Sequence, residues 1–195
     1  MTGITISRAL TLSAVFLAGT TAVTATPAQA AEVKITSLGS HAGEFCRQDR
    51  ALIFEDPDGT RLLYDPGRTV AGGNDPRLGK IDAVLVSHMH GDHAGDRHLP
   101  APGAGTCAKP DVSAKATPHT NAANIAIATG AKIVTGSEMP KFFAGKLKAL
   151  GGDPKKSVLV RFGASTAVGG VTITTVPAAH SNGVAGAMVG GELGK

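Results

Sequence analysis

Apolar and polar residues alternate with a period of two in the early part of the chain, a pattern typical of half-buried β-strands. The alternation is clearest at 33–38, and two further short runs, at 51–55 and 60–64, flank the string Asp-Pro-Asp-Gly at 56–59. Because Asp, Pro and Gly favour tight turns, these two runs are expected to form a hairpin. The pattern therefore predicts that the fold begins with β structure.

A continuous apolar run at 81–87 follows a stretch rich in Gly, Pro, Asn and Asp at 65–80. The run predicts a strand buried on both faces, and the stretch before it predicts a surface loop. Further strands are expected at 131–135, 157–162 and 171–176, where β-branched residues are frequent.

Helical periodicity appears twice, at 121–129 and at 138–150. Ser137 is the expected N-cap of the second helix, and the glycines at 151–152 are expected to end it. Before the first helix, residues 99–119 carry four prolines and are expected to form an irregular excursion near the mouth of a site. The second helix places five residues on one apolar face for core packing: Met139, Phe142, Phe143, Leu147 and Leu150.

Residues 1–30 have the three-part layout of a secretory signal peptide. Arg8 supplies the positive charge, the apolar run 9–19 follows, and an Ala-x-Ala site ends at Ala30. The run is shorter than the roughly 20 residues that span a bilayer, so a cleaved signal is favoured over a membrane anchor. The expected mature domain is 31–195, located in the periplasm or secreted, without a membrane contact after cleavage.

The composition favours a globular α/β or β-rich domain with many turns. Among the 195 residues there are 26 glycines but only 6 Phe, 1 Tyr and no Trp, so the core depends on aliphatic side chains. The net charge of +4 is a mild excess without a strongly basic face, which argues against a nucleic-acid partner. The oligomeric state is left open.

Cys46 and Cys107 are the two cysteines of the chain. Their spacing matches neither a zinc knuckle nor a Cys-x-x-Cys redox motif. In an exported protein they can form one disulfide, whereas two free buried thiols are the alternative. The sequence leaves both possibilities open.

The chemistry of the chain is concentrated in a six-residue string that begins at His88 and reads His-Met-His-Gly-Asp-His. In an extended segment, alternate side chains project to the same side, so His88 and His90 can face one metal ion while Met89 turns away. Asp92 and His93 then face a neighbouring position where a second ion can bind. Because burying these side chains unpaired is costly, the string predicts a metal site at the end of a strand.

The first ion needs a third protein ligand, since catalytic zinc sites commonly keep three ligands and an open position. His180 is the best candidate, because it also follows a predicted strand. His41 is a weaker candidate for a role beside the ligands or the substrate. His98 and His119 are interpreted as surface or hydrogen-bonded core residues.

The string at 88–93 resembles the H-x-H-x-D-H signature of the metallo-β-lactamase superfamily, and the resemblance extends over about 33–195. The segment at 65–67 and His180 after a later strand match the usual order of that superfamily. The resemblance implies an αβ/βα sandwich with a dinuclear zinc site at one edge of its sheets. It is greatest to general metal-dependent hydrolases rather than to antibiotic-degrading members.

The resemblance also implies a ligand set for each ion. His88, His90 and His180 would hold one, and Asp92 and His93 the other, together with a later histidine and a bridging aspartate. The sequence departs from this pattern after His180, where a glycine-rich stretch runs to its end. We therefore expect a sandwich that is incomplete at the C-terminus, with two zinc ions in a full-length protein and one in this chain.

The expected function is that of a zinc-dependent hydrolase. Metal-bound hydroxide would attack an ester, lactone or related bond of a small-molecule substrate, and Asp92 would act as the catalytic carboxylate that orients the nucleophile or relays a proton. The alternative is a non-catalytic metal-binding fragment that lacks the ligands of the second metal.

Overall fold

The computed structural model describes residues 31–43, 45–180 and 188. The expected signal peptide at 1–30, and the glycine-rich stretch after His180 apart from Met188, lie outside the described residues.

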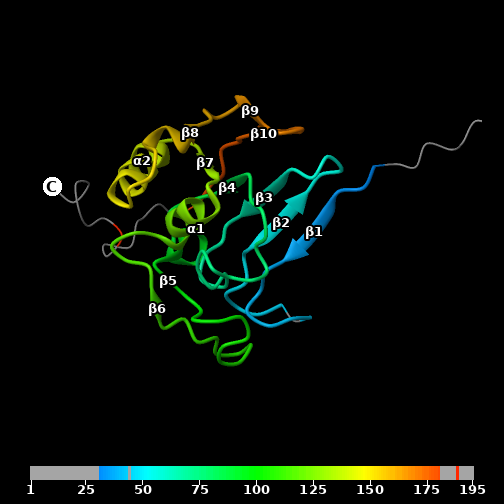
Figure 1. The fold of residues 1–195 in the computed structure, drawn as a ribbon, viewed down its shortest axis with the longest axis vertical. Coiled ribbons are helices and arrows are strands. Elements are labelled where there is room, and N and C mark those ends of the chain that lie inside the picture. Colours follow the sequence, from blue (N-terminus) through cyan, green and yellow to red (C-terminus); the bar gives the residue numbers. More distant parts are fainter. Residues whose placement is uncertain (1–30, 44, 181–187, 189–195) are drawn as a thin grey trace, which may run out of the picture. The chain divides into compact units, whose positions relative to one another are not determined.

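Six strands form one mixed sheet in the order β1-β2-β3-β4-β7-β8 (Figure 1). β1, β2 and β3 pair in antiparallel fashion, as the predicted hairpin requires, whereas β3, β4, β7 and β8 run parallel. The carboxyl ends of these parallel strands therefore meet at one edge of the sheet. The bounds are β1 Lys34–Ser37, β2 Leu52–Glu55, β3 Arg61–Tyr64, β4 Ala83–Leu85, β7 Lys132–Thr135 and β8 Ser157–Leu159.

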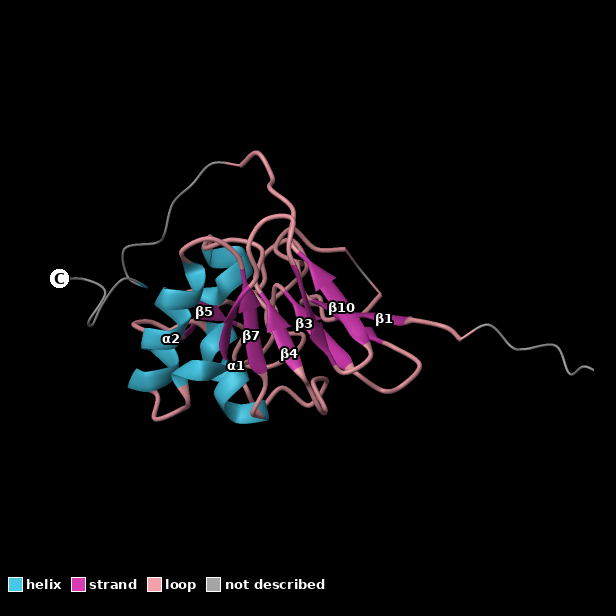
Figure 2. Cartoon of the chain, turned by 90° about the horizontal axis from the view of Figure 1, so that it is seen from above, coloured by secondary structure: helices cyan, strands magenta, loops and turns pink. Residues whose placement is uncertain are grey.

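Two helices, α1 (Asn121–Thr129) and α2 (Met139–Ala149), pack on the same side of this sheet, as Figure 2 shows. The Thr120 side chain accepts a hydrogen bond from the Ala123 amide at 3.0 Å and caps α1. Within the part of the chain that the structure describes, no helix combines the length and hydropathy needed to cross a bilayer.

The predicted N-cap of α2 is wrong. Ser137 has a φ of 55°, in the left-handed region, whereas an N-cap residue needs an extended backbone. Glu138 occupies the cap position instead and makes no capping hydrogen bond with its side chain. Pro140 in the first turn compensates in part, because a proline there needs no N–H partner.

The core lies on both faces of the sheet. The helix side holds the larger cluster, in which Phe143 and Leu147 of α2 pack on Ile133 and Val84. Met139, Phe142 and Leu150 pack against it partly buried, so the apolar face predicted for this helix is confirmed.

The opposite face is covered by a hairpin of β9 (Ser165–Val168) and β10 (Val171–Thr174). Val168 is buried there against strand residues such as Leu62 and Val134. The strand β9 was not predicted, because its sequence, Ser-Thr-Ala-Val, has little apolar pattern of its own. The α/β class itself is confirmed.

The excursion at 99–119 is mostly irregular, as expected, but its last part forms β6 (Ala114–Lys115), which pairs with β5 (Arg97–His98). A disulfide joins Cys46 to Cys107, so of the two alternatives for the cysteines the bridge is the one present. It ties the excursion to the loop between β1 and β2, near the carboxyl edge of the sheet.

Candidate metal centre

The histidine string begins directly after β4, at the carboxyl edge of the parallel strands. His90 has an extended backbone, with φ −68° and ψ 150°, before the π-helical turn η1 (Gly91–Gly95). Met89 is only 9% exposed and belongs to the core cluster on the helix side of the sheet. The predicted alternation is therefore present, because His88 and His90 lie together while Met89 turns inward.

His180 joins these two side chains from a segment far along the chain. Ligand atoms of His88, His90 and His180 all lie within 4.8 Å of one another. The ring centroid of His88 is 4.6 Å from that of His90 and 4.3 Å from that of His180. The structure thus brings together the three residues that the sequence assigned to one ion.

The state of His88 fits a metal ligand. Its Nε2 atom is buried and has no hydrogen-bond partner among the described residues. Burial, followed by the nearby His93, His180 and His90 rings, lowers the pKa of His88 from 6.5 to about 4. The ring is therefore neutral at physiological pH, which is the form that binds a metal ion.

A buried carboxylate orients the neighbouring histidine. His93 Nδ1 lies 2.7 Å from Asp65 Oδ2, and Asp65 is fully buried at the end of β3. With the carboxylate as acceptor for the Nδ1 proton, the lone pair of His93 is on Nε2, which lies 3.6 Å from Asp92 Oδ2. The centroids of His88 and His93 are 4.0 Å apart, so this oriented ring adjoins the triad.

The same carboxylate also holds Ser87. It accepts hydrogen bonds from the Ser87 amide at 2.8 Å and from the Ser87 hydroxyl at 2.7 Å. That hydroxyl lies 3.0 Å from Nδ1 of His88. Asp65 therefore influences two histidines. The sequence predicts only that the Asp-Pro-Gly at 65–67 ends a strand and matches the usual order of the superfamily, and it assigns Asp65 no part in the site. Its left-handed backbone, with φ 44°, marks it as an unusual position.

Asp92 lies beside the triad rather than within it. Its Oδ2 atom is 3.6 Å from Nε2 of His93 and 3.2 Å from Nη2 of Arg50. Arg50 could not be predicted from the sequence, because the β1–β2 loop carries no motif that points to the histidine string. The proposed second-ion ligands, Asp92 and His93, are thus neighbours, but an arginine is paired with one of them.

The backbone around the string is closely packed against the loop after β3. The Gly67 amide donates to the His93 carbonyl at 2.9 Å, and a Cβ at Gly67 would collide with the Asp92 carbonyl oxygen. The buried side-chain Nδ2 of Asn121 donates to the carbonyls of Gly67 and Val70 at 2.9 and 2.8 Å. These contacts connect the first turn of α1 to the segment that carries the histidines.

The remaining histidines lie outside this cluster. His41 is within 3.3 Å of the Ser40 hydroxyl and of the Gly105 carbonyl, in the loops joined by the disulfide. His98 Nδ1 donates to the Leu99 carbonyl at 2.7 Å. Burial, with a smaller contribution from Lys146, lowers the pKa of His119.

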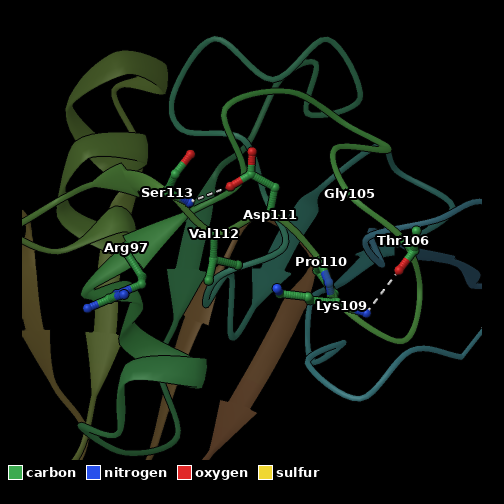
Figure 3. Close-up of a pocket in the computed structure, with 8 residues that line it drawn as sticks. All are labelled: Arg97, Gly105, Thr106, Lys109, Pro110, Asp111, Val112 and Ser113. Carbon is green, nitrogen blue, oxygen red and sulfur yellow. Dashed lines mark hydrogen bonds between the residues drawn. The ribbon is translucent and has the colours of Figure 1, made fainter.

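One surface hollow lies away from the histidines. It has a volume of about 560 Å³ and lies in the excursion, where Arg97, Lys109 and Asp111 border it (Figure 3). The Ser113 amide donates to Asp111 Oδ1 at 3.1 Å beside it. None of the histidines lines this hollow, and it is the metal-ligand chemistry that identifies the candidate site.

Comparison with known proteins places the chain in a family. The beta-lactamase superfamily domain matches residues 48–194, and the chain therefore belongs to the metallo-β-lactamase superfamily. This confirms the resemblance carried by the histidine string and its αβ/βα fold class.

Among curated proteins, the chain is similar to several named UPF0173 metal-dependent hydrolase. It is 29% identical to that of Pyrococcus furiosus over 77% of this chain and 49% of the relative. For that of Anaeromyxobacter dehalogenans strain 2CP-1 the identity is 29%, over 69% of this chain and 41% of the relative. It is 31% identical to the protein of this name from Pyrococcus abyssi, over 63% of this chain and 42% of the relative. The chain thus spans about half the length of these relatives, or somewhat less.

Proposed function

We propose that this chain carries the metal centre of a metal-dependent hydrolase, and that zinc is the preferred ion. The observation that carries the proposal is the meeting of His180 with His88 and His90, whose ligand atoms lie within 4.8 Å of one another. Three neutral imidazoles are a common ligand set for catalytic zinc. The relatives are named metal-dependent hydrolases, which supports the same reaction type.

Each residue of the site has a role in this proposal. A divalent ion at the triad supplies activation of water and polarisation of the scissile bond. Asp65 holds His93 in one tautomer through the Nδ1 hydrogen bond, and Ser87 links the same carboxylate to His88. Asp92, beside His93 Nε2, is placed to orient a water molecule or to pass a proton to the leaving group.

The proposed substrate is a small molecule with an ester, lactone, thioester or related bond. The loops around the site decide selectivity, so the superfamily alone does not specify the compound. We also propose that the protein works in the periplasm or outside the cell. The disulfide between Cys46 and Cys107 supports this location, because such bridges persist in oxidising compartments.

The proposal is tested by titrating metal-stripped protein with Zn²⁺ in a calorimeter. We expect tight binding to the wild type and a loss of at least about 100-fold in affinity for His180→Ala, which removes a direct ligand. His98→Ala is the matched control, since His98 lies outside the triad. Equal affinities for the wild type and His180→Ala would contradict the proposed site. Hydrolysis is then assayed on a panel of esters, lactones and thioesters, where His88→Ala should abolish any turnover.

A second candidate function is metal binding without turnover. It is favoured by the pairing of Asp92 with Arg50, which occupies the carboxylate proposed to act in catalysis. Zinc binding that depends on His180, combined with no hydrolysis of any bond class in the panel, would support this candidate over the hydrolase.

A further inference from the structure

Arg50 reaches the metal centre from an element that carries none of the proposed ligands. It lies in the loop before β2, next to the buried Ala51, and its Nη2 atom is 3.2 Å from Asp92 Oδ2. The side chains of Arg50 and Asp92 are 38% and 30% exposed, so the ion pair lies at the surface opening of the site rather than in the core.

The position of Arg50 is supported by its own loop. Its Nη1 atom donates to the Asp49 carbonyl at 2.7 Å and approaches the Arg47 carbonyl at 3.4 Å. The Asp49 carboxylate in turn accepts hydrogen bonds from the amides of Ser40 and Cys46 at 2.8 and 2.9 Å.

The ends of this loop are also fixed. The Leu38 amide donates to the Ala51 carbonyl at 2.9 Å, which closes the base of the loop. The disulfide from Cys46 to Cys107 connects it to the excursion. The guanidinium is therefore held near Asp92 by two hydrogen bonds to carbonyls of its own loop, and the loop is fixed at its base and by the disulfide.

The charge of Arg50 affects what can bind at Asp92. A divalent ion at Asp92 and His93 would lie within a few ångströms of the guanidinium, and like charges at that distance repel even in water. The repulsion weakens binding of a second ion by at least about tenfold. A guanidinium is always charged and presents several N–H donors, so it can itself neutralise the carboxylate.

We propose that Arg50 acts as the second cation of this centre: it neutralises Asp92 in the place of a second metal ion, so that the chain binds one ion at His88, His90 and His180. Arg50 is thus a positioning residue that holds Asp92 beside His93. The inference rests on the proposed metal site but goes beyond it, because a metal-dependent hydrolase of this superfamily is expected to hold two ions.

The inference is tested by counting ions. Metal-stripped wild type, Arg50→Gln, Arg50→Lys and Arg47→Gln are each titrated with Co²⁺, whose absorption reports its ligands, and the bound metal is measured by elemental analysis. Arg47→Gln is the matched control, because it removes the same charge from the same loop without touching Asp92. The variant Arg50→Gln/Asp92→Asn shows whether an added ion uses Asp92.

We expect one ion per chain for the wild type, Arg50→Lys and Arg47→Gln. Arg50→Gln should bind a second ion at least about tenfold more tightly than the wild type does. The double variant Arg50→Gln/Asp92→Asn should again bind one ion per chain. A second ion that binds the wild type as tightly as it binds Arg50→Gln overturns the inference and leaves the proposed function standing. The inference is also overturned if Arg47→Gln gains as much affinity for a second ion as Arg50→Gln does, or if Arg50→Gln gains none. No bound ion in any protein overturns the metal site itself, and the inference with it.

Discussion

Among single residues, Asp65 has the largest influence on the orientation of the histidines. It is fully buried and accepts hydrogen bonds from His93 Nδ1 and from both the amide and the hydroxyl of Ser87. A carboxylate in this position fixes the tautomer and the rotation of a ligand ring, and such partners commonly affect metal affinity by 10- to 100-fold, an order-of-magnitude range. Its role is therefore chemical as well as structural.

The substitution Asp65→Asn tests this role with almost no change in volume. The amide can offer an N–H to His93 Nδ1, which favours the opposite tautomer, so we expect zinc affinity to fall by about 10- to 100-fold. Calorimetric titration measures the effect. Asp58→Asn, in the exposed β2–β3 turn, is the control and should bind zinc as the wild type does. Unchanged affinity in Asp65→Asn would show that the hydrogen bond does not orient the ligand.

The depressed pKa of His88 predicts how stability depends on pH in the metal-free protein. Burial and then the neighbouring rings lower this pKa from 6.5 to about 4, so between these values the unfolded chain binds more protons than the folded chain. The free energy of unfolding should therefore decrease as the pH falls from about 6.5 to about 4.

Thermal or urea denaturation of chelator-treated protein across this pH range measures the effect. The variant His88→Gln lacks the titrating group, and its stability should change less steeply between pH 6.5 and 4 than that of the wild type. A parallel course for the two proteins would show that His88 keeps an ordinary pKa.

At the scale of elements, the observed bounds agree best with the predicted bounds where an element is held by hydrogen bonds between residues that are close in the sequence. The helix α1 has the bounds expected from periodicity, because its hydrogen bonds and its Thr120 cap lie within a few residues. The observed bounds of the strands differ more from the predicted ones. The expected strand at 157–162 is paired only over Ser157–Leu159, since its neighbour β7 ends at Thr135. The length of a strand is set by its partner and not by its own pattern.

The loop between β1 and β2 carries both Arg50, which contacts Asp92, and Cys46, which is bridged to the excursion. The disulfide joins Cys46 to Cys107, which are 61 residues apart in the sequence. A cross-link over a loop of this length commonly stabilises a folded domain by about 2–4 kcal/mol. Its loss should affect this loop and the excursion more than the distant helices.

Thiol labelling checks this element directly. Both cysteines should resist labelling in the folded, exported protein until a reductant is added, and Cys46→Ser/Cys107→Ser should lose about 2–4 kcal/mol of unfolding free energy. Denaturation curves of the oxidised protein and the double variant provide the comparison. Ready labelling without reductant would show that the bridge is absent in solution.

At the scale of the whole described domain, two apolar clusters on opposite faces of one sheet place the site. Buried helix residues such as Phe143 pack on one face, and Val168 of the β9–β10 hairpin packs on the other. After β10, which pairs with β9 in a separate two-stranded sheet, the chain brings the His180 ring centroid to 4.3 Å from that of His88. The triad is therefore a product of the tertiary structure, since no local element contains all three ligands.

The sequence by itself determined the parts of this protein that depend on neighbouring residues. The string from His88 to His93 specified metal chemistry, and the period of the apolar residues specified the helices, because residue type and spacing act over one turn or one strand. His180 does lie with His88 and His90, but not for the predicted reason, because β10 pairs with β9 in a separate two-stranded sheet and shares no sheet with β4.

The tertiary structure decided what depends on residues that are distant in the sequence. It paired His93 with Asp65, placed Arg50 on Asp92, and joined Cys46 to Cys107. None of these contacts has a sequence spacing that predicts it, because each forms only after the loops have been positioned by the sheet. Two ligands of the proposed ion, His88 and His90, are thus encoded locally, whereas the meeting with His180 and the charges and hydrogen bonds that orient the ligands arise from long-range packing.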